Sequence, residues 1–184
     1  TYTTGEAKPP WVTLLGCFND AAGIDIRTLS TNSATNCFKE CTTSIFVGIQ
    51  KNKCICRMTF TSITDVQNAN LQTYSKCNRG ENGFMSVYAK VSPLPNTISQ
   101  DADYGYVYVN ISSSFSYEFH ATADSMESHN FICYDIFKQC FFRSGNFDRW
   151  ESKLAWSECN LVSFFDLASC LKQSSFETGV FWIG

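Results

Sequence analysis

Two short stretches decide the fold of the first half of this chain: TNCFKEC at residues 35–41 and KCIC at residues 53–56. The two cysteines of the first stretch are four residues apart, so a helix places both sulfur atoms on one face. The two cysteines of the second stretch are two residues apart, and alternate residues of a strand also share a face. Because a bridge within Cys-x-Cys would be strained, we predict two parallel disulfides that join a short helix to a strand.

The 184-residue chain contains ten cysteines: Cys17, Cys37, Cys41, Cys54, Cys56, Cys77, Cys133, Cys140, Cys159 and Cys170. Their even number and irregular spacing are typical of disulfides formed in an oxidising compartment. Zinc is the competing interpretation, but zinc sites usually repeat a short cysteine knuckle and recruit histidine. The two histidines, His120 and His129, do not lie near a cysteine pair. We therefore predict disulfides, and neither a metal site nor a cofactor.

The cysteines also suggest how the chain divides. In the first half, the double bridge leaves Cys17 to pair with Cys77, whereas the four cysteines after residue 132 allow three connectivities among which the sequence does not choose. A stiff stretch with Pro93 and Pro95 separates the two groups. We predict an extended arm (1–11), a first module (12–92), a linker (93–99) and a second module (100–184).

Other residues of the first module follow an ordered pattern. The pattern runs through LGCFND at residues 15–20, Arg27 and Leu29, the first cysteine pair, FVGIQ at residues 46–50, the second cysteine pair, and MSVY at residues 85–88. In order and spacing it resembles the WSC domain over about residues 12–90, half of the chain.

The resemblance implies a WSC-like (PAN/apple-like) fold and an extracellular, non-catalytic module that binds carbohydrate. It brings no sugar-contacting motif that can be carried over residue by residue. A pyranose site needs a flat aromatic face and planar polar groups. The aromatic candidates are Trp11, Phe60 and Tyr74, and the polar candidates near them in sequence are Asn19, Asp20 and Asn78. The alternative for each aromatic side chain is that it packs in the core.

The second module has the pattern of a small α+β domain rich in strands. Residues 115–121 alternate between apolar and polar side chains, which predicts a half-buried strand, and residues 106–111 are apolar on both faces, which favours a more central strand. Residues 112–114 predict the turn between these strands. Residues 179–183 predict a further strand, which we expect to be unguarded and able to add to a neighbouring sheet.

Helices and a modification site complete the second module. Capping patterns predict one helix that begins at Asp148 and another after Asn160. Asn110-Ile111-Ser112 is the one N-glycosylation triplet, so we expect a glycan on Asn110. The alternative is that Asn110 lies inside a strand and stays unmodified. His120 falls on the polar side of its strand and is interpreted as a solvated residue rather than a catalytic base.

Composition excludes several classes of protein. The net charge is −3 and no basic stripe is present, which argues against nucleic-acid binding. No apolar run approaches the roughly 20 residues that span a bilayer. The chain has no sequence motif of a serine hydrolase, a metalloprotease or a phosphate-binding loop, so we expect no enzymatic activity. Charged residues make up only 17%, while serine and threonine number 21 and 16, which favours a hydroxyl-rich or glycosylated surface.

These observations lead to one functional hypothesis and two alternatives. The leading hypothesis is a secreted, cell-surface or matrix protein whose WSC-like module binds glycans or polysaccharide, or forms part of a glycan-rich coat. The first alternative is a structural subunit of an extracellular filament or matrix that self-associates through its extended termini. The second is the non-catalytic part of a larger secreted enzyme or sensor.

Overall fold

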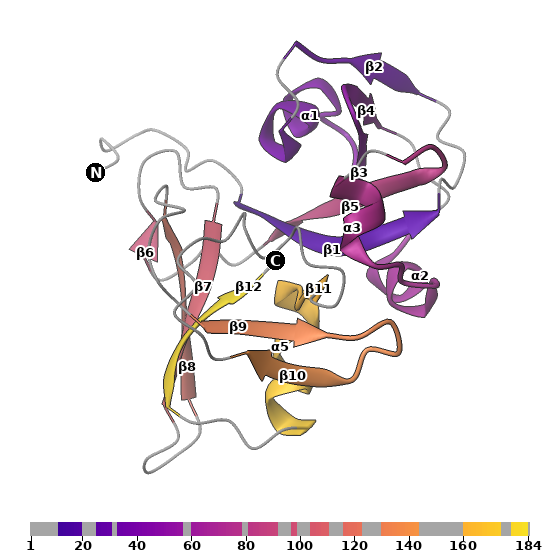
Figure 1. The fold of residues 1–184 in the computed structure, drawn as a ribbon. Coiled ribbons are helices and arrows are strands. Elements are labelled where there is room, and N and C mark those ends of the chain that lie inside the picture. The colour runs from indigo at the N-terminus through magenta and orange to yellow at the C-terminus, as the bar shows by residue number, and fades with distance from the viewer. Residues whose placement is uncertain are drawn as a thin grey trace, which may run out of the picture.

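The computed structural model describes residues 11–19, 25–30, 33–56, 60–78, 81–91, 97–98, 104–110, 116–122, 130–143, 160–173 and 178–183. In these residues the chain is an α+β protein built on two sheets that are largely antiparallel, with helices packed beside them (Figure 1). The expected α+β class and the expected disulfides are confirmed. In the described part of the chain, no helix is long and apolar enough to cross a membrane.

The first sheet has five antiparallel strands in the order β1-β5-β3-β4-β2. Their bounds are Trp11–Asn19 for β1, Ile26–Thr28 for β2, Phe46–Gln50 for β3, Lys53–Ile55 for β4 and Phe84–Val91 for β5. Met85, Val87 and Ala89 alternate along β5 and are fully buried, as period-two patterning requires of a strand with one face on a core.

Three short helices belong to the same half: α1 (Ala34–Glu40), α2 (Ile63–Asn68) and α3 (Tyr74–Asn78). The α2 helix begins with a capping box, in which the Ser62 hydroxyl accepts from the Asp65 amide and the Asp65 carboxylate accepts from the Ser62 amide. Helices this short are only marginally stable in isolation, so their caps and the disulfides contribute much of their stability.

Disulfides fix α1 and α3 to the sheet, and α1 has the double bridge to a strand that the cysteine spacing predicted. Cys37 pairs with Cys54 and Cys41 with Cys56, which staples α1 to β4 and the residue that follows it. Cys17 pairs with Cys77 and joins β1 to α3. The described cysteines contain no free thiol, and the four bridges with both ends described indicate an oxidising environment.

The second sheet has seven strands, ordered β10-β9-β12-β7-β8-β6 with β11 also paired to β9. Their bounds are Thr97–Ile98 for β6, Tyr104–Asn110 for β7, Ser116–Thr122 for β8, Asn130–Tyr134 for β9, Cys140–Arg143 for β10, Asn160–Leu161 for β11 and Gly179–Ile183 for β12. Helix α5 (Phe164–Gln173) is joined to β10 by the Cys140–Cys170 bridge. Cys133 is also disulfide-bonded, while Cys159 lies outside the described residues.

The expectation of an unguarded C-terminal strand is wrong. β12 lies inside the second sheet, antiparallel to β7 along its whole length and parallel to β9 at Phe181 and Trp182. Phe181 and Ile183, which share one face of the strand, are buried in the core. The strands expected at residues 106–111 and 115–121 are confirmed as β7 and β8. A helix follows Asn160 as expected, but α5 begins only at Phe164, because Asn160 and Leu161 pair with β9 as strand β11. The turn at 112–114 and the helix expected at Asp148 lie outside the described residues.

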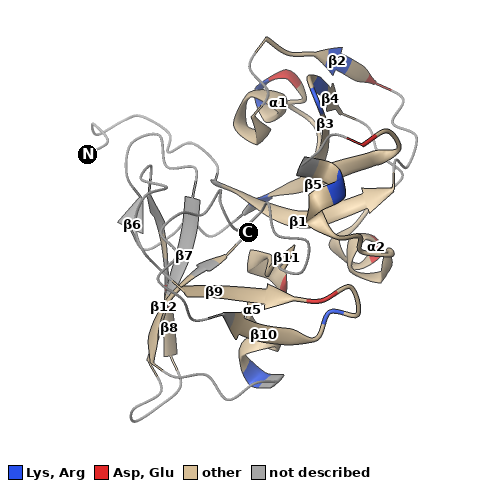
Figure 2. Ribbon diagram, viewed as in Figure 1, with Lys and Arg blue, Asp and Glu red and all other residues tan. Residues whose placement is uncertain are grey.

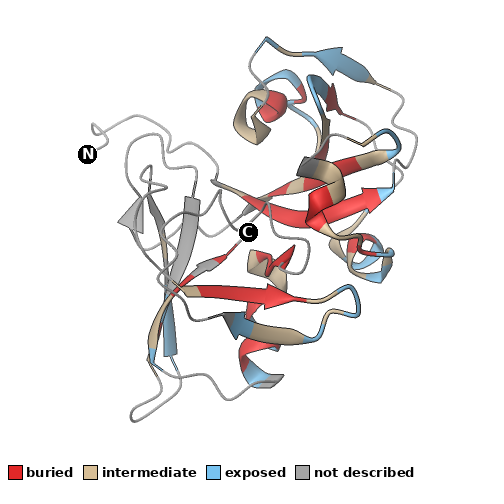
Figure 3. Ribbon diagram, viewed as in Figure 1, coloured by how far each residue is buried: buried red, intermediate tan, exposed pale blue. Residues whose placement is uncertain are grey.

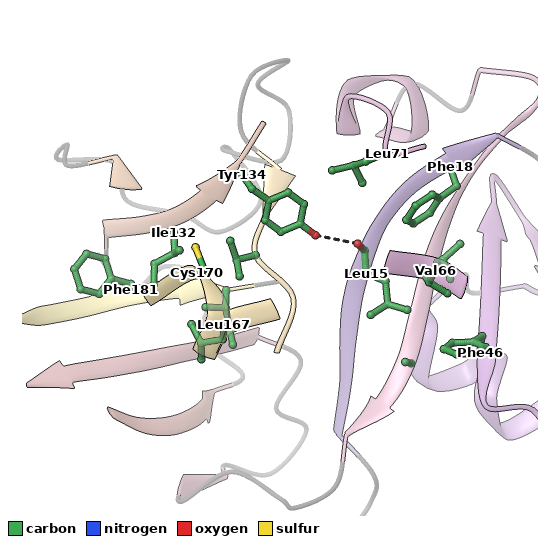
Figure 4. Packing of buried hydrophobic residues seen from close by; sticks show 14 of the residues in the cluster. Leu15, Phe18, Phe46, Val66, Leu71, Ile132, Tyr134, Leu167, Cys170 and Phe181 are labelled. Carbon is green, nitrogen blue, oxygen red and sulfur yellow. Dashed lines mark hydrogen bonds between the residues drawn. The ribbon is translucent and has the colours of Figure 1, made fainter. Parts of the chain in front are cut away.

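The two halves pack against each other around a shared core. One cluster of buried residues includes Leu15 and Phe18 from the first half and Ile132, Tyr134 and Leu167 from the second (Figure 4). The buried segments of β1, β5 and β9 lie where the two halves meet (Figure 3). The expected linker, residues 93–99, includes β6, which pairs with β8.

Candidate binding site

The structure divides the residues that sequence analysis proposed for sugar binding. Asn19 and Phe60 share one end of β1, where the Phe60 ring packs edge-on against Phe18 with centroids 5.7 Å apart. Trp11 begins the same strand, and nine residues of strand separate the two ends by about 27 Å. The side chain of Trp11 and all of Asp20 lie outside the described residues.

Tyr74 occupies a different environment from the one a stacking residue needs. It is only 8% exposed and packs in a buried cluster with Leu14 and Leu161 from the two halves. Its backbone amide donates to the Asn160 side chain at 3.0 Å, and burial raises the pKa of its hydroxyl. Tyr74 therefore joins the halves, and its ring face is not open to a ligand. Asn78 ends α3, but its side chain is outside the described residues.

The sulfur atoms of Cys37, Cys41 and Cys54 lie within 4.8 Å of one another. All three belong to disulfides, which leaves no thiolate to bind a metal ion. This cluster is a structural cross-link.

The turn between β9 and β10 is held by hydrogen bonds within the turn itself. Asp135 organises it: one carboxylate oxygen accepts from the backbone amides of Phe137 and Gln139 at 2.8 and 2.9 Å. The Asp135 backbone amide donates to the Gln139 carbonyl at 3.1 Å, and the Asp135 carbonyl accepts from the Lys138 amide at 2.9 Å. Lys138 adopts a left-handed φ of 59°. Such a φ is uncommon for a side chain larger than glycine, so the surrounding contacts hold the turn in one conformation.

This turn carries the most exposed large apolar side chain of the described residues. Phe137 is 79% exposed, and Ile136 beside it is 48% exposed. A turn normally carries small or polar residues, so two adjacent apolar side chains at its tip are unusual. Neither residue was among the sequence-predicted binding residues, although two adjacent apolar residues in Asp-Ile-Phe-Lys, between two short strands, are visible in the sequence.

A cavity of about 140 Å³ lies behind the turn, lined by Tyr134, Lys138, Cys140, Asp166, Ser169 and Cys170. The Lys138 ammonium group donates to the Gln67 backbone carbonyl, while the Gln67 side chain donates to Asp166 at 2.7 Å. The second Asp166 oxygen accepts from the Ser163 hydroxyl at 3.0 Å. This network joins α2 of the first half to the β9–β10 turn and to the start of α5.

The charged groups of this network, Lys138 and Asp166, are both hydrogen-bonded within the fold. Desolvation lowers the pKa of Lys138, and the nearby Asp166 carboxylate partly opposes that shift. The Lys138 amine donates to a carbonyl, and each Asp166 oxygen accepts from a neighbouring side chain. Charged side chains are otherwise sparse on the described parts of both halves (Figure 2).

Two further residues from the sequence analysis lie on β7 and β8. Asn110 is the last residue of β7 and is half-buried. His120 is 17% exposed, and its Nε2 lies 3.4 Å from a carboxylate oxygen of Glu118. The imidazole is therefore mostly covered and paired, rather than fully solvated.

Comparison with known proteins finds no match, whether with family models, curated proteins or solved structures. The resemblance to the WSC domain therefore rests on the residues of the first half quoted above.

Proposed function

We propose that this chain is a non-catalytic extracellular protein that binds carbohydrate through the β9–β10 turn. The observation that carries the proposal is the 79% exposure of Phe137 on a turn fixed by its own hydrogen bonds. An exposed aromatic ring offers the flat apolar face on which the C–H side of a pyranose packs.

Polar groups beside the ring supply the second requirement of a sugar site. Gln139 is exposed two residues from Phe137, and its side-chain amide can both donate to and accept from sugar hydroxyls. The Asp135 carboxylate lies in the same turn. Because the turn is held in one conformation, little backbone entropy is lost when a ligand binds.

The first half supports this surface. Its α2 helix holds the turn through the bond between Lys138 and the Gln67 carbonyl, and its WSC-like sequence pattern implies a carbohydrate-binding role. The four bridges and the low content of charged residues are consistent with a secreted, cell-surface or matrix location. The proposal thus keeps the ligand class that the resemblance implies and moves the contact surface to the second half.

The test uses the full, oxidised chain, because separating the halves would expose their shared core. Wild type, Phe137→Ala and Ile45→Ala are measured for retention on a panel of insoluble polysaccharides, followed by titration on the best one. Ile45 is the matched control, since it is 62% exposed in the first half, away from the turn. We expect the Phe137 variant to bind at least about tenfold more weakly, a loss of about 1.4 kcal/mol, with Ile45→Ala unchanged.

Two results would overturn the proposal. If wild type is retained on no polysaccharide, the ligand class is wrong. If Phe137→Ala binds as tightly as wild type, the turn is not the contact surface.

Self-association is the second candidate function, and the apolar pair Ile136 and Phe137 favours it. The C-terminal strand does not support assembly through the extended termini, because β12 is internal to its sheet. The N-terminal residues 1–10 lie outside the described residues. Sedimentation velocity over a range of concentrations decides the matter. A dimer that Phe137→Ala returns to monomer would support self-association, and a wild-type monomer at high concentration would exclude it.

A further inference from the structure

We propose that Asn110 carries an N-linked glycan whose first sugar packs on the ring of Tyr108, beside the carboxylate of Glu118. Asn110 lies at the end of β7 that pairs with the start of β12, whereas the β9–β10 turn lies beyond the other end of these strands, so the inference is independent of the function proposed above. It rests on the glycosylation triplet, the strand register and the exposure of the residues around it.

The register places the acceptor and the aromatic ring on one face. Tyr108 and Asn110 are alternate residues of β7, with the fully buried Val109 between them on the opposite face. Across the ladder, Tyr108 pairs with Glu118 and Asn110 pairs with Ser116. Asn110 is thus at the edge of a small outward face rather than in the core.

The distances suit a single pyranose. Alternate residues of a strand are about 7 Å apart, and directly paired residues of adjacent strands are about 5 Å apart. A sugar bonded to Asn110 therefore reaches the ring of Tyr108 without any change in the backbone. The receiving groups are accessible, since Tyr108 is 39% exposed and the Glu118 side chain is 63% exposed.

The chemistry of the face fits N-acetylglucosamine, the first sugar of an N-linked glycan. The tyrosine ring packs against the C–H face of the pyranose, while the carboxylate accepts from a hydroxyl or from the acetamido N–H. The Nε2 atom of His120 lies 3.4 Å from a carboxylate oxygen of Glu118. The Glu118 carboxylate would then have the His120 imidazole on one side and the sugar on the other.

The attachment is an ordinary glycosyl transfer in the secretory pathway. The side-chain nitrogen of Asn110 forms a bond to C1 of the sugar, supplied by a lipid-linked oligosaccharide diphosphate. The C1–O bond to the diphosphate breaks, the lipid diphosphate leaves with the electron pair, and the amide nitrogen releases one proton. No electron is transferred to or from the protein.

Tyr117 provides an internal control for the test. It is also 39% exposed, but it pairs with Val109 and therefore belongs to the opposite face of the same two strands. The full chain is secreted from eukaryotic cells as wild type and as Ser112→Ala, which removes the triplet while keeping Asn110. Both proteins are treated with tetranitromethane, and nitration of each tyrosine is measured by peptide mapping.

We expect Asn110 to be glycosylated in wild type and Tyr108 to be nitrated several-fold more slowly there than in Ser112→Ala. Nitration of Tyr117 should be equal in the two proteins. Trimming the glycan to its first sugar with an endoglycosidase should leave the protection of Tyr108 in place.

Each contrary result overturns a definite part of the inference. An unmodified Asn110 in the secreted wild type refutes the modification site. A glycosylated protein in which Tyr108 reacts as fast as in Ser112→Ala, or in which Tyr117 is equally protected, refutes the packing of the sugar on Tyr108.

Discussion

Replacing Tyr134 with phenylalanine tests the contact between the two halves. Tyr134 is 1% exposed on β9, and its hydroxyl donates to the backbone carbonyl of Leu15 at 3.0 Å (Figure 4). Leu15 is the residue that the β1–β5 ladder skips, because the register shifts between Leu14 and Gly16. The tyrosine hydroxyl therefore supplies a donor to a carbonyl at the bulge, and phenylalanine removes that donor while keeping the ring.

The magnitude follows from the loss of one buried hydrogen bond without loss of apolar burial. A buried acceptor left without its partner costs about 1–3 kcal/mol of unfolding free energy. In a chain of this size each kcal/mol lowers Tm by about 2–4 °C, so we expect a decrease of roughly 2–12 °C.

The difference in unfolding free energy between wild type and Tyr134→Phe depends on pH in a definite direction. Burial raises the pKa of Tyr134 well above its ordinary value of 10.0. The stabilisation is therefore complete below pH 10 and decreases as the pH rises beyond it, where the unfolded chain releases the phenolic proton and the folded chain retains it. The advantage of wild type over Tyr134→Phe should shrink above pH 10.

The assay is urea unfolding followed by far-ultraviolet circular dichroism and by intrinsic fluorescence. We expect one transition in both probes, with an unchanged slope and a lower midpoint for Tyr134→Phe. Tyr108→Phe, an equivalent change at a residue that is 39% exposed, should unfold like wild type. Equal midpoints for Tyr134→Phe and wild type, or separate transitions of the two halves in wild type, would refute the reasoning.

Three further predictions concern the first half. The double variant Cys41→Ser/Cys56→Ser, which opens a bridge of sequence separation 15, should lose about 3 kcal/mol of unfolding free energy in urea, and an unchanged midpoint would contradict this. Gly16→Ala should lower the melting temperature by several degrees, because φ is +144° and the added carbon would lie 2.3 Å from Leu71 Cδ1; a stability equal to wild type would show that the bulge relaxes. Hydrogen bonds from Thr61 lower the pKa of Asp65, so the capping contact of its carboxylate at the start of α2 should be lost only as the pH falls below 3.8. Amide chemical shifts of α2 should follow this loss in wild type and should not change over the same pH range in Asp65→Asn.

The sequence by itself determined the local framework of the first half. Spacings of four and two fix which side chains share a face of a helix or a strand, so the bridges from Cys37 and Cys41 to Cys54 and Cys56 could be predicted without knowing the fold. The strands β7 and β8 followed from local patterning for the same reason. The candidate site could not be predicted in this way, because exposure of Phe137 depends on what packs around its turn.

Tertiary structure alone decided the order of strands and the contact between the halves. Residues 106–111 and 179–183 are both apolar on both faces, a pattern that fits a central strand as well as an unguarded one. Only the pairing of β12 with β7 and β9 decided its place. The bond between Tyr134 and the Leu15 carbonyl joins residues 119 apart in sequence. Periodicity reports which face of one element is apolar, whereas the partner of that face is set by long-range packing that no local pattern contains.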